Sequence, residues 1–199
     1  TFKKYASSIH KLVSLLLSFP TMVINSFYDI LNILTAFLSL FFGLYLLSLK
    51  SKNRLPNVLI GLYLLITAVD SGTLFISQFI SPSYPGIGLL ISTTFFISPP
   101  LLYFYIYSVT YQDFKLMAKH LLHVIPFMLA ILILIPRYYL ADFDQKIEIL
   151  SSRDGLIVEM KLVYLMLHVQ LLTYIIASYI LIIKSKKLLL ENYSNVNIN

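Results

Sequence analysis

Two ionisable side chains, Asp70 and His168, lie inside apolar runs long enough to form membrane-crossing helices. Asp70 lies 13 residues beyond Asn57, where its run begins, which is about 20 Å along a helix that rises about 1.5 Å per residue. His168 lies 12 residues beyond Leu156, about 18 Å from the opposite end of its own run. In a hydrocarbon core about 30 Å thick, the two side chains lie at similar depth, so the spacing predicts that they can meet.

Such a pair would be a proton-sensitive or ligand-binding site. A carboxylate inside a membrane-spanning helix is costly, and it usually faces a partner or a cavity. The competing interpretation is a structural hydrogen bond that joins Asp70 to Thr67, Ser71 or a neighbouring helix. We favour this interpretation because interhelical polar contacts are common. Alternative partners for Asp70 are polar residues in the run that contains His168, namely Tyr164, Gln170 and Tyr174.

Motifs for catalysis, metal binding or cofactor binding are missing from the sequence. His120 and His123 have the i, i+3 spacing of helical metal ligands, but no HExxH pattern accompanies them, so no metal is assigned. No GxSxG elbow, no Gly-rich phosphate loop and no Cys occurs. The tyrosines from Tyr103 to Tyr111 are expected to anchor a helix end at a membrane interface. We therefore predict no catalytic residue, no cofactor and no enzyme activity.

The composition places the chain in the class of membrane proteins. Hydrophobic residues make up 58% of the 199 residues, charged residues only 12%, and the mean hydropathy is +0.83. A soluble domain has about a quarter charged residues, so this chain could not cover a water-facing surface. The net charge of +6 comes from cations beside the apolar runs, which is typical of membrane loops rather than of a nucleic-acid site. We expect an all-α polytopic membrane helix bundle.

Five spanning helices are expected, preceded by an N-terminal targeting or interfacial segment at residues 1–28. The five-helix transmembrane domain is predicted over residues 29–188 and a cytoplasmic linker over residues 189–199. Because proline removes a helix hydrogen bond and clashes with the preceding turn, the pair Pro99 and Pro100 predicts a kink at about residues 96–100. The expected spans are residues 30–49, 57–80, 87–110, 121–139 and 156–183.

The loop charges predict the orientation of the bundle. Eight Lys and Arg residues follow the first, third and fifth spans, against four in the two opposite loops, which also carry five acidic residues. Cations favour the cytoplasmic side, so the first span starts outside and the fifth ends inside, in a bacterial inner membrane. Three N-terminal cations fit this orientation only if residues 1–28 act as a targeting signal. These three are Lys3, Lys4 and Lys11.

The third and fourth spans carry two short motifs, PLLY at residues 100–103 and LHVIPF at residues 122–127, joined by the basic connector FKLMAKH. Their order resembles the membrane domain of AraC-type helix-turn-helix regulators of Bacteroidetes-like bacteria. The segment ENYSN at residues 191–195 resembles the linker that enters the sixth span of that family. The resemblance implies a seven-helix membrane sensor followed by a cytoplasmic DNA-binding domain. The chain stops after its fifth span, so DNA contact is expected only through a C-terminal domain beyond it.

The resulting expectation is a sensory, signal-transducing input domain of a membrane-bound transcription regulator. A shift of helix packing at Pro99 and Pro100 would pass the signal to an output domain, either a helix-turn-helix unit or a kinase. The alternative is a small transporter or channel subunit that uses Asp70 and His168 as an intramembrane polar pair. The expected partners are the lipid bilayer and an unidentified stimulus or ligand, and a homodimer stays open.

Overall fold

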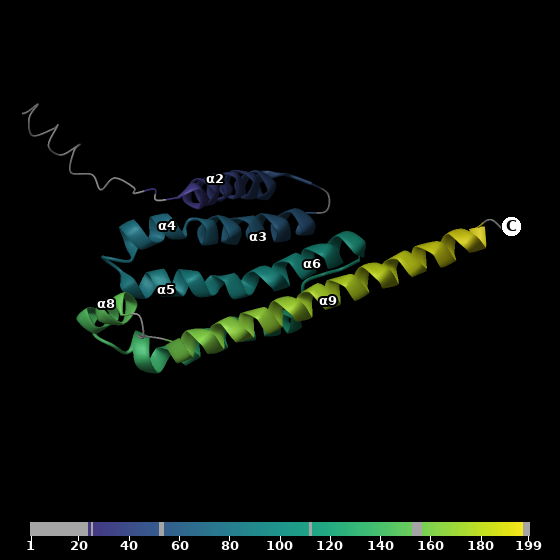
Figure 1. The fold of residues 1–199 in the computed structure, drawn as a ribbon. Helices are drawn as coiled ribbons and strands as arrows, with labels where there is room; N and C mark the ends of the chain where they lie inside the picture. Colours follow the sequence, from purple (N-terminus) through teal and green to yellow (C-terminus); the bar gives the residue numbers. More distant parts are fainter. Residues whose placement is uncertain (1–23, 25, 52–53, 112, 153–156, 197–199) are drawn as a thin grey trace, which may run out of the picture.

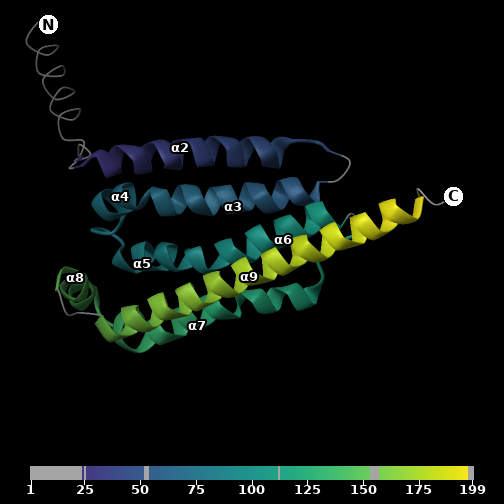
Figure 2. The same cartoon turned by 45° about the vertical axis from the view of Figure 1, so that its right-hand side comes forward.

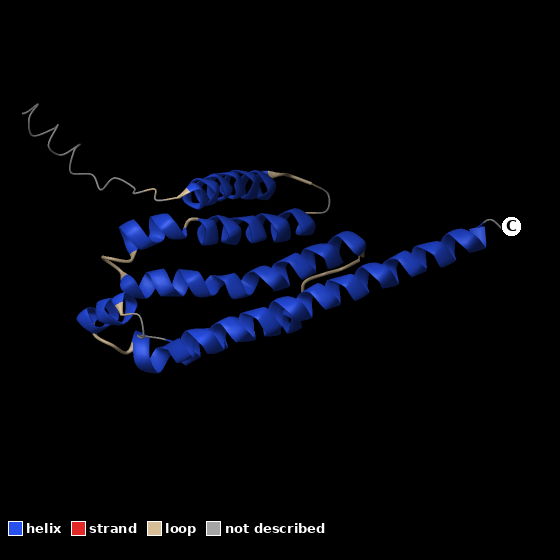
Figure 3. Cartoon of the chain, viewed as in Figure 1, coloured by secondary structure: helices blue, strands red, loops and turns tan. Residues whose placement is uncertain are grey.

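The computed structural model describes residues 24, 26–51, 54–111, 113–152 and 157–196. These residues form helices and short connections, with no strand among them (Figure 3). The all-helical part of the prediction is therefore confirmed. The predicted targeting or interfacial segment, residues 1–28, lies outside the described residues except for its last few positions.

The first helical pair is held together by small residues. Helix α2 (Phe27–Ser48) begins at a capping box, in which Ser26 and Asp29 each bond the other's backbone N–H, and helix α3 (Leu55–Ser71) follows. A Cβ added to Gly43 would lie 3.1 Å from the carbonyl oxygen of Gly61. Small residues allow two helix backbones to approach this closely without a polar contact.

The second predicted span is broken rather than straight. Helix α3 ends at Ser71. The next segment consists of α4 (Thr73–Phe75) and a π-helical turn (Ile76–Ile80), and it is bent by 46° relative to α3. In the described part of the chain, four helices are long and apolar enough to cross a membrane, or five if this bent pair counts as one span. The prediction of five spanning helices is thus met only if the bent pair counts as one span.

The third predicted span contains the double proline and stays one span, Pro85–Thr110. It consists of α5 (Pro85–Thr93), a 3₁₀ turn (Thr94–Ile97) and α6 (Ser98–Thr110). Pro99 and Pro100 lie buried in the first turn of α6, where a missing N–H is tolerated. At the position of the predicted kink, the backbone changes from α-helical to 3₁₀ hydrogen bonding.

The remaining helices complete the bundle. A 3₁₀ helix (Ala118–Val124) leads into α7 (Ile125–Leu134) and a π-helical turn (Ile135–Tyr139). The short helix α8 (Phe143–Ser151) was not predicted from the sequence, which shows only a polar stretch there. The last helix, α9 (Ile157–Val196), runs for 40 residues, so most of the segment predicted as a linker, 189–199, continues this helix.

The connections alternate between the two ends of the bundle (Figures 1 and 2). The loops that follow α2 and α6 lie at one end, and the C-terminal half of α9 projects beyond the bundle at that same end. The turn before α5 and helix α8 lie at the opposite end. The described cations that follow the first, third and fifth predicted spans therefore lie toward one end of the molecule.

The core lies where α7 meets α9 and the 3₁₀ turn that precedes α6. One buried cluster joins Phe96, Ala130 and Val163 from these three elements. A second cluster, Leu134 with Tyr138, packs against Leu89 of α5 and Met160 of α9. These contacts order one end of the α7–α9 pair and leave the other end more open.

Candidate ligand-binding pocket

A pocket of about 1250 Å³ opens at the end of the α7–α9 pair where the basic loop follows α6. Its size exceeds that of most small-molecule sites, which are about 300–1,000 Å³ and mostly apolar. Helix α6, the loop after it, the 3₁₀ helix, α7 and α9 all contribute to its wall. The lining residues are Tyr103, Phe104, Tyr107, Tyr111, Asp113, Phe114, Lys115, Met117, Lys119, His120, Leu122, His123, Ile125, Pro126, Leu129, Leu165, Met166, Val169, Gln170, Thr173, Tyr174 and Ala177.

The wall nearest the basic loop is aromatic. Phe104 and Tyr107 lie one turn apart on α6, and Phe114 from the loop packs on both, with ring centroids 6.1 Å and 4.4 Å away. Tyr103 faces Tyr174 of α9 at 5.7 Å between ring centroids. Three of the tyrosines predicted as interface anchors, Tyr103, Tyr107 and Tyr111, therefore form part of a pocket wall. Ring packing fixes this wall without closing the space between α6, α7 and α9.

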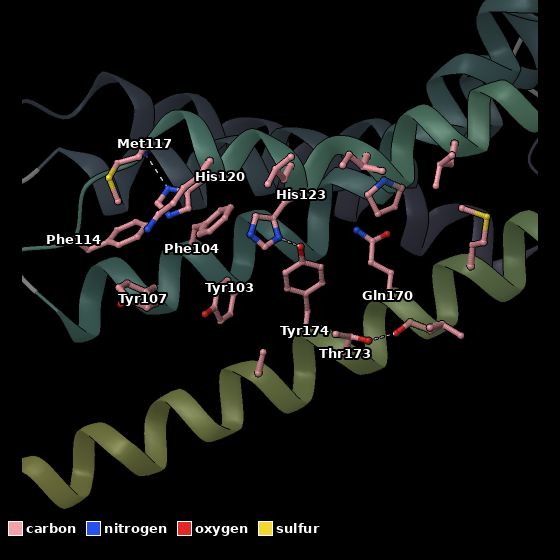
Figure 4. A pocket seen from close by; sticks show the side chains of 18 of the residues that line it. Tyr103, Phe104, Tyr107, Phe114, Met117, His120, His123, Gln170, Thr173 and Tyr174 are labelled. Atoms are coloured by element: carbon pink, nitrogen blue, oxygen red, sulfur yellow. Dashed lines mark hydrogen bonds between the residues drawn. The ribbon is translucent and has the colours of Figure 1, made fainter.

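Both histidines of the 3₁₀ helix face this aromatic wall (Figure 4). In a 3₁₀ helix, side chains at i and i+3 are nearly eclipsed, which brings His120 and His123 to the same side. The Phe104 ring lies beside both imidazoles, at 5.0 Å from His120 and 4.9 Å from His123. His123 hydrogen-bonds the hydroxyl of Tyr174, and His120 Nδ1 accepts the backbone N–H of Met117 at 3.0 Å.

Gln170 of α9 lines the pocket beyond the aromatic wall and joins α9 to the turn before α6. The side chain is 7% exposed, and its Nε2 donates to the carbonyl oxygen of Phe96 at 2.9 Å. In an α-helix that carbonyl would accept the N–H four residues later, but Pro100 has none. Gln170 therefore supplies the donor that the proline removes. Its own Oε1 has no hydrogen-bond partner.

The opposite end of the α7–α9 pair is closed. Tyr138, in the turn after α7, is fully buried, and its hydroxyl donates to the carbonyl oxygen of Pro85 at 2.7 Å. On the surface beside it, Arg137 Nη1 lies 3.2 Å from a carboxylate oxygen of Glu159. A hydroxyl bonded to the backbone of a third helix thus seals this end.

The predicted pair of Asp70 and His168 is not formed. Asp70 is exposed on α3 beside the bend, and its carboxylate forms no hydrogen bond or ion pair with another described residue, so the favoured structural hydrogen bond is absent as well. His168 is exposed on α9, and its Nδ1 bonds the carbonyl oxygen of Tyr164 in its own helix at 2.7 Å. The two exposed side chains therefore do not bond each other, and Asp70 bonds none of its alternative partners among the described residues.

The pocket was not predicted, although its residues had been noticed one by one. Gln170 and Tyr174 were considered only as partners for Asp70, and His123 only as a metal ligand or motif residue. No group of three or more potential metal ligands occurs among the described residues. The available signal was an amide side chain in one apolar run and a proline in another. A buried amide needs a hydrogen-bond acceptor, and a proline leaves a backbone carbonyl without its donor.

The chain is all-helical over its described residues, and its apolar helices are suited to a membrane. Comparison with models of protein families, with curated proteins and with solved structures found no match. The functional argument therefore depends on the pocket and on the helices that form it.

Proposed function

We propose that the chain is the membrane-embedded sensory input domain of a membrane-bound transcription regulator of the AraC type. The carrying observation is that α9 lines the pocket between Leu165 and Ala177 and then continues as the same helix to Val196. At about 1.5 Å per residue, 40 residues extend roughly 60 Å, twice the thickness of a hydrocarbon core. A rigid helix of this length joins the pocket to whatever lies beyond the membrane.

The end with the basic loops is the cytoplasmic end in this proposal. Lys50, Arg54, Lys115 and Lys119 lie in or beside the loops at that end, and α9 leaves the bundle there (Figure 1). Excess Lys and Arg on one side of a membrane protein is the usual mark of the cytoplasm. The bundle would then lie in a bacterial inner membrane, with the start of α2 outside.

The proposed signal is a change in the packing of α6 against α9. The Tyr103–Tyr174 ring pair joins α6 to α9, and the Gln170 bond joins α9 to Phe96 in the turn that precedes α6. The bond lies at the 3₁₀ turn before Pro99 and Pro100, where the backbone departs from α-helical hydrogen bonding. A ligand in the pocket that favours one arrangement shifts the population toward it, and α9 transmits the change. DNA would be bound by a domain that follows α9, with a homodimer as the plausible active form.

Disulfide locking tests this proposal without background reactions, because the chain has no Cys. Tyr103→Cys combined with Tyr174→Cys replaces the ring pair that joins α6 to α9 with two thiols. Oxidation should hold transcription from a reporter gene at one level whatever the stimulus. The control pair is Leu47→Cys with Gly61→Cys, in the close α2–α3 contact, and it should leave the reporter responsive. A reporter that still responds with α6 locked to α9 would contradict the proposal.

The coding sequence beyond Asn199 gives a second, independent test. A helix-turn-helix domain there supports a DNA-binding output, and a histidine-kinase domain supports a sensor with a different output. A stop codon at that point would contradict the regulator proposal. The transporter alternative needs Asp70 and His168 to act together, and these residues lie apart. Flux through the reconstituted chain that is abolished by Asp70→Asn would revive it.

A further inference from the structure

We infer that the pocket binds a single-chain anionic amphiphile, with its carboxylate or phosphate head at the basic loop and its apolar chain between α7 and α9. The inference names the ligand class of the proposed sensor, and it rests on that proposal only for the signalling role. Binding itself is independent of any output domain. Three observations support the inference: the change of chemistry along the pocket, the charges at its rim, and its opening toward the surrounding apolar surface.

The lining changes from polar and aromatic to aliphatic with distance from the basic loop. Lys115, Lys119 and His120 belong to the outer end, next to the aromatic wall. Leu129 of α7 and Leu165 and Met166 of α9 form the inner end with little polarity. A molecule with one charged end and a flexible apolar chain matches this division, because each part then meets surface of its own kind. A uniformly polar solute would bury its polar groups against the aliphatic end.

The rim carries positive charge that is available to a ligand. Lys115 and Lys119 are exposed, and neither forms an ion pair among the described residues. Asp113 contributes one opposing charge at the same rim, so the two lysines outnumber it. His120 accepts the Met117 N–H at Nδ1, so its neutral form carries the proton on Nε2 and can donate there. Ammonium groups and one N–H donor suit an anionic oxygen.

The inner part of the pocket opens sideways. Leu129, Leu165 and Val169 line the pocket, yet each is also exposed on the outer surface of the bundle. In a membrane this surface meets lipid chains, so a lipid-like molecule can enter from the bilayer without crossing water. Gln170 lies behind these residues with an unpaired Oε1, so the innermost wall still has an acceptor for a hydroxyl on the chain or for water.

Single tryptophans provide the test, because the chain has no Trp. Val169→Trp places the indole in the pocket, and Leu172→Trp places it on another part of the α9 surface, at a position equally exposed (58% and 59%). The whole chain is inserted into phosphatidylcholine nanodiscs and titrated with 9,10-dibromostearate, whose bromines quench tryptophan on contact. Quenching should saturate at low mole fraction for Val169→Trp and rise only in proportion to the probe for Leu172→Trp.

A second reporter pair covers the case in which Val169→Trp fills the pocket or unfolds the chain. Leu129→Trp lies in the pocket wall on α7, and Leu132→Trp lies outside it on the same helix. Saturable quenching at Leu129→Trp, with no saturable component at Leu132→Trp, supports the inference. Proportional quenching at both pocket positions, in chains with intact helical circular dichroism, overturns it, because the site then behaves as ordinary lipid-facing surface.

The head group is tested with three brominated probes that share one chain. The fatty acid and a lysophosphatidate should both bind. The ratio of their affinities shows whether carboxylate or phosphate is the preferred head. The neutral methyl ester should bind about tenfold more weakly. Lys115→Gln with Lys119→Gln should remove that preference. The matched control, Lys184→Gln with Lys186→Gln, neutralises two exposed cations of α9 outside the pocket and should keep it. Equal binding of ester and acid to the unmodified chain overturns the inference.

Failure of this inference can be told apart from failure of the proposed function. Saturable binding of the anionic probes without any change in the reporter supports the ligand class and contradicts the sensor. A reporter controlled by the α6–α9 lock, with no saturable binding of any probe, supports the sensor and contradicts the ligand class.

Discussion

The two ends of the α7–α9 pair use the same residue type, tyrosine, with opposite results. At one end, Tyr138 is fully buried and its hydroxyl reaches the Pro85 carbonyl, so the pair is sealed against α5. At the other end, the Tyr174 hydroxyl bonds the side chain of His123, and a pocket of about 1250 Å³ remains. A hydroxyl that reaches backbone draws the third helix into contact. The Tyr174 hydroxyl instead joins two side chains at the pocket and reaches no backbone group of a third helix.

The comparison separates a stabilising end from a binding end within one helix pair. The closed end should carry most of the free energy of unfolding that this pair contributes. The open end should tolerate substitution better, because its groups already border empty or ligand-filled space. Four sets of substitutions test this division, beginning with the largest expected effect.

Truncation of the two tyrosines should give the largest difference. Tyr138→Ala leaves a cavity in a site without access to lipid, and should lower the free energy of unfolding by about 3–5 kcal/mol. Tyr174→Ala only enlarges an existing pocket, and should cost about half as much or less. Unfolding titrations with sodium dodecyl sulfate, followed by circular dichroism, measure both. Equal losses for the two variants would remove the distinction between the ends.

The amide that joins α9 to the turn before α6 comes next. Gln170→Leu leaves the Phe96 carbonyl without a donor, and should cost about 1–3 kcal/mol of the free energy of unfolding. Pro100→Ala restores a backbone N–H to that carbonyl, so in this background the cost of Gln170→Leu should fall. The double-mutant cycle measures the coupling directly. Strictly additive effects would show that Gln170 does not replace the missing proline donor.

Removal of single hydroxyls sharpens the same comparison at lower cost. Tyr138→Phe leaves the buried Pro85 carbonyl without its side-chain donor, and should cost about 1 kcal/mol of the free energy of unfolding. Tyr174→Phe frees His123 at the edge of an open pocket, where water can bond it, and should be nearly neutral. The same detergent titration applies, and a larger loss for Tyr174→Phe would reverse the assignment of the two ends.

The smallest effect is expected from the surface ion pair beside the closed end. Arg137→Gln should change the free energy of unfolding by about 0.5 kcal/mol, because exposed pairs contribute little. The effect should decrease at high salt, as charge screening requires. Lys161→Gln, an exposed cation of α9 without an ion pair among the described residues, is the control. A salt-independent loss above that of Tyr138→Phe would place this ion pair, rather than the tyrosine, at the centre of the closed end.

Proline positions show how far local sequence rules reach. Pro99 and Pro100 predicted a change of backbone at residues 96–100, and a 3₁₀ turn lies at residues 94–97. The same rule did not find the bend after Ser71, which contains no proline, nor the donor that satisfies the Phe96 carbonyl. Loss of an N–H is a property of one residue. The donor that replaces it comes from Gln170, which lies 74 residues from Phe96 along the chain.

The sequence by itself determined where the apolar helices lie, because length and hydropathy along the chain depend only on residue order. It also predicted similar depths for Asp70 and His168, since a helix rises by a constant amount per residue. Only the tertiary structure decided which side chains face each other. Helices that are apolar on all sides have no polar face to mark their orientation. For that reason Asp70 and His168 are apart, while His123, Gln170 and Tyr174 line one pocket.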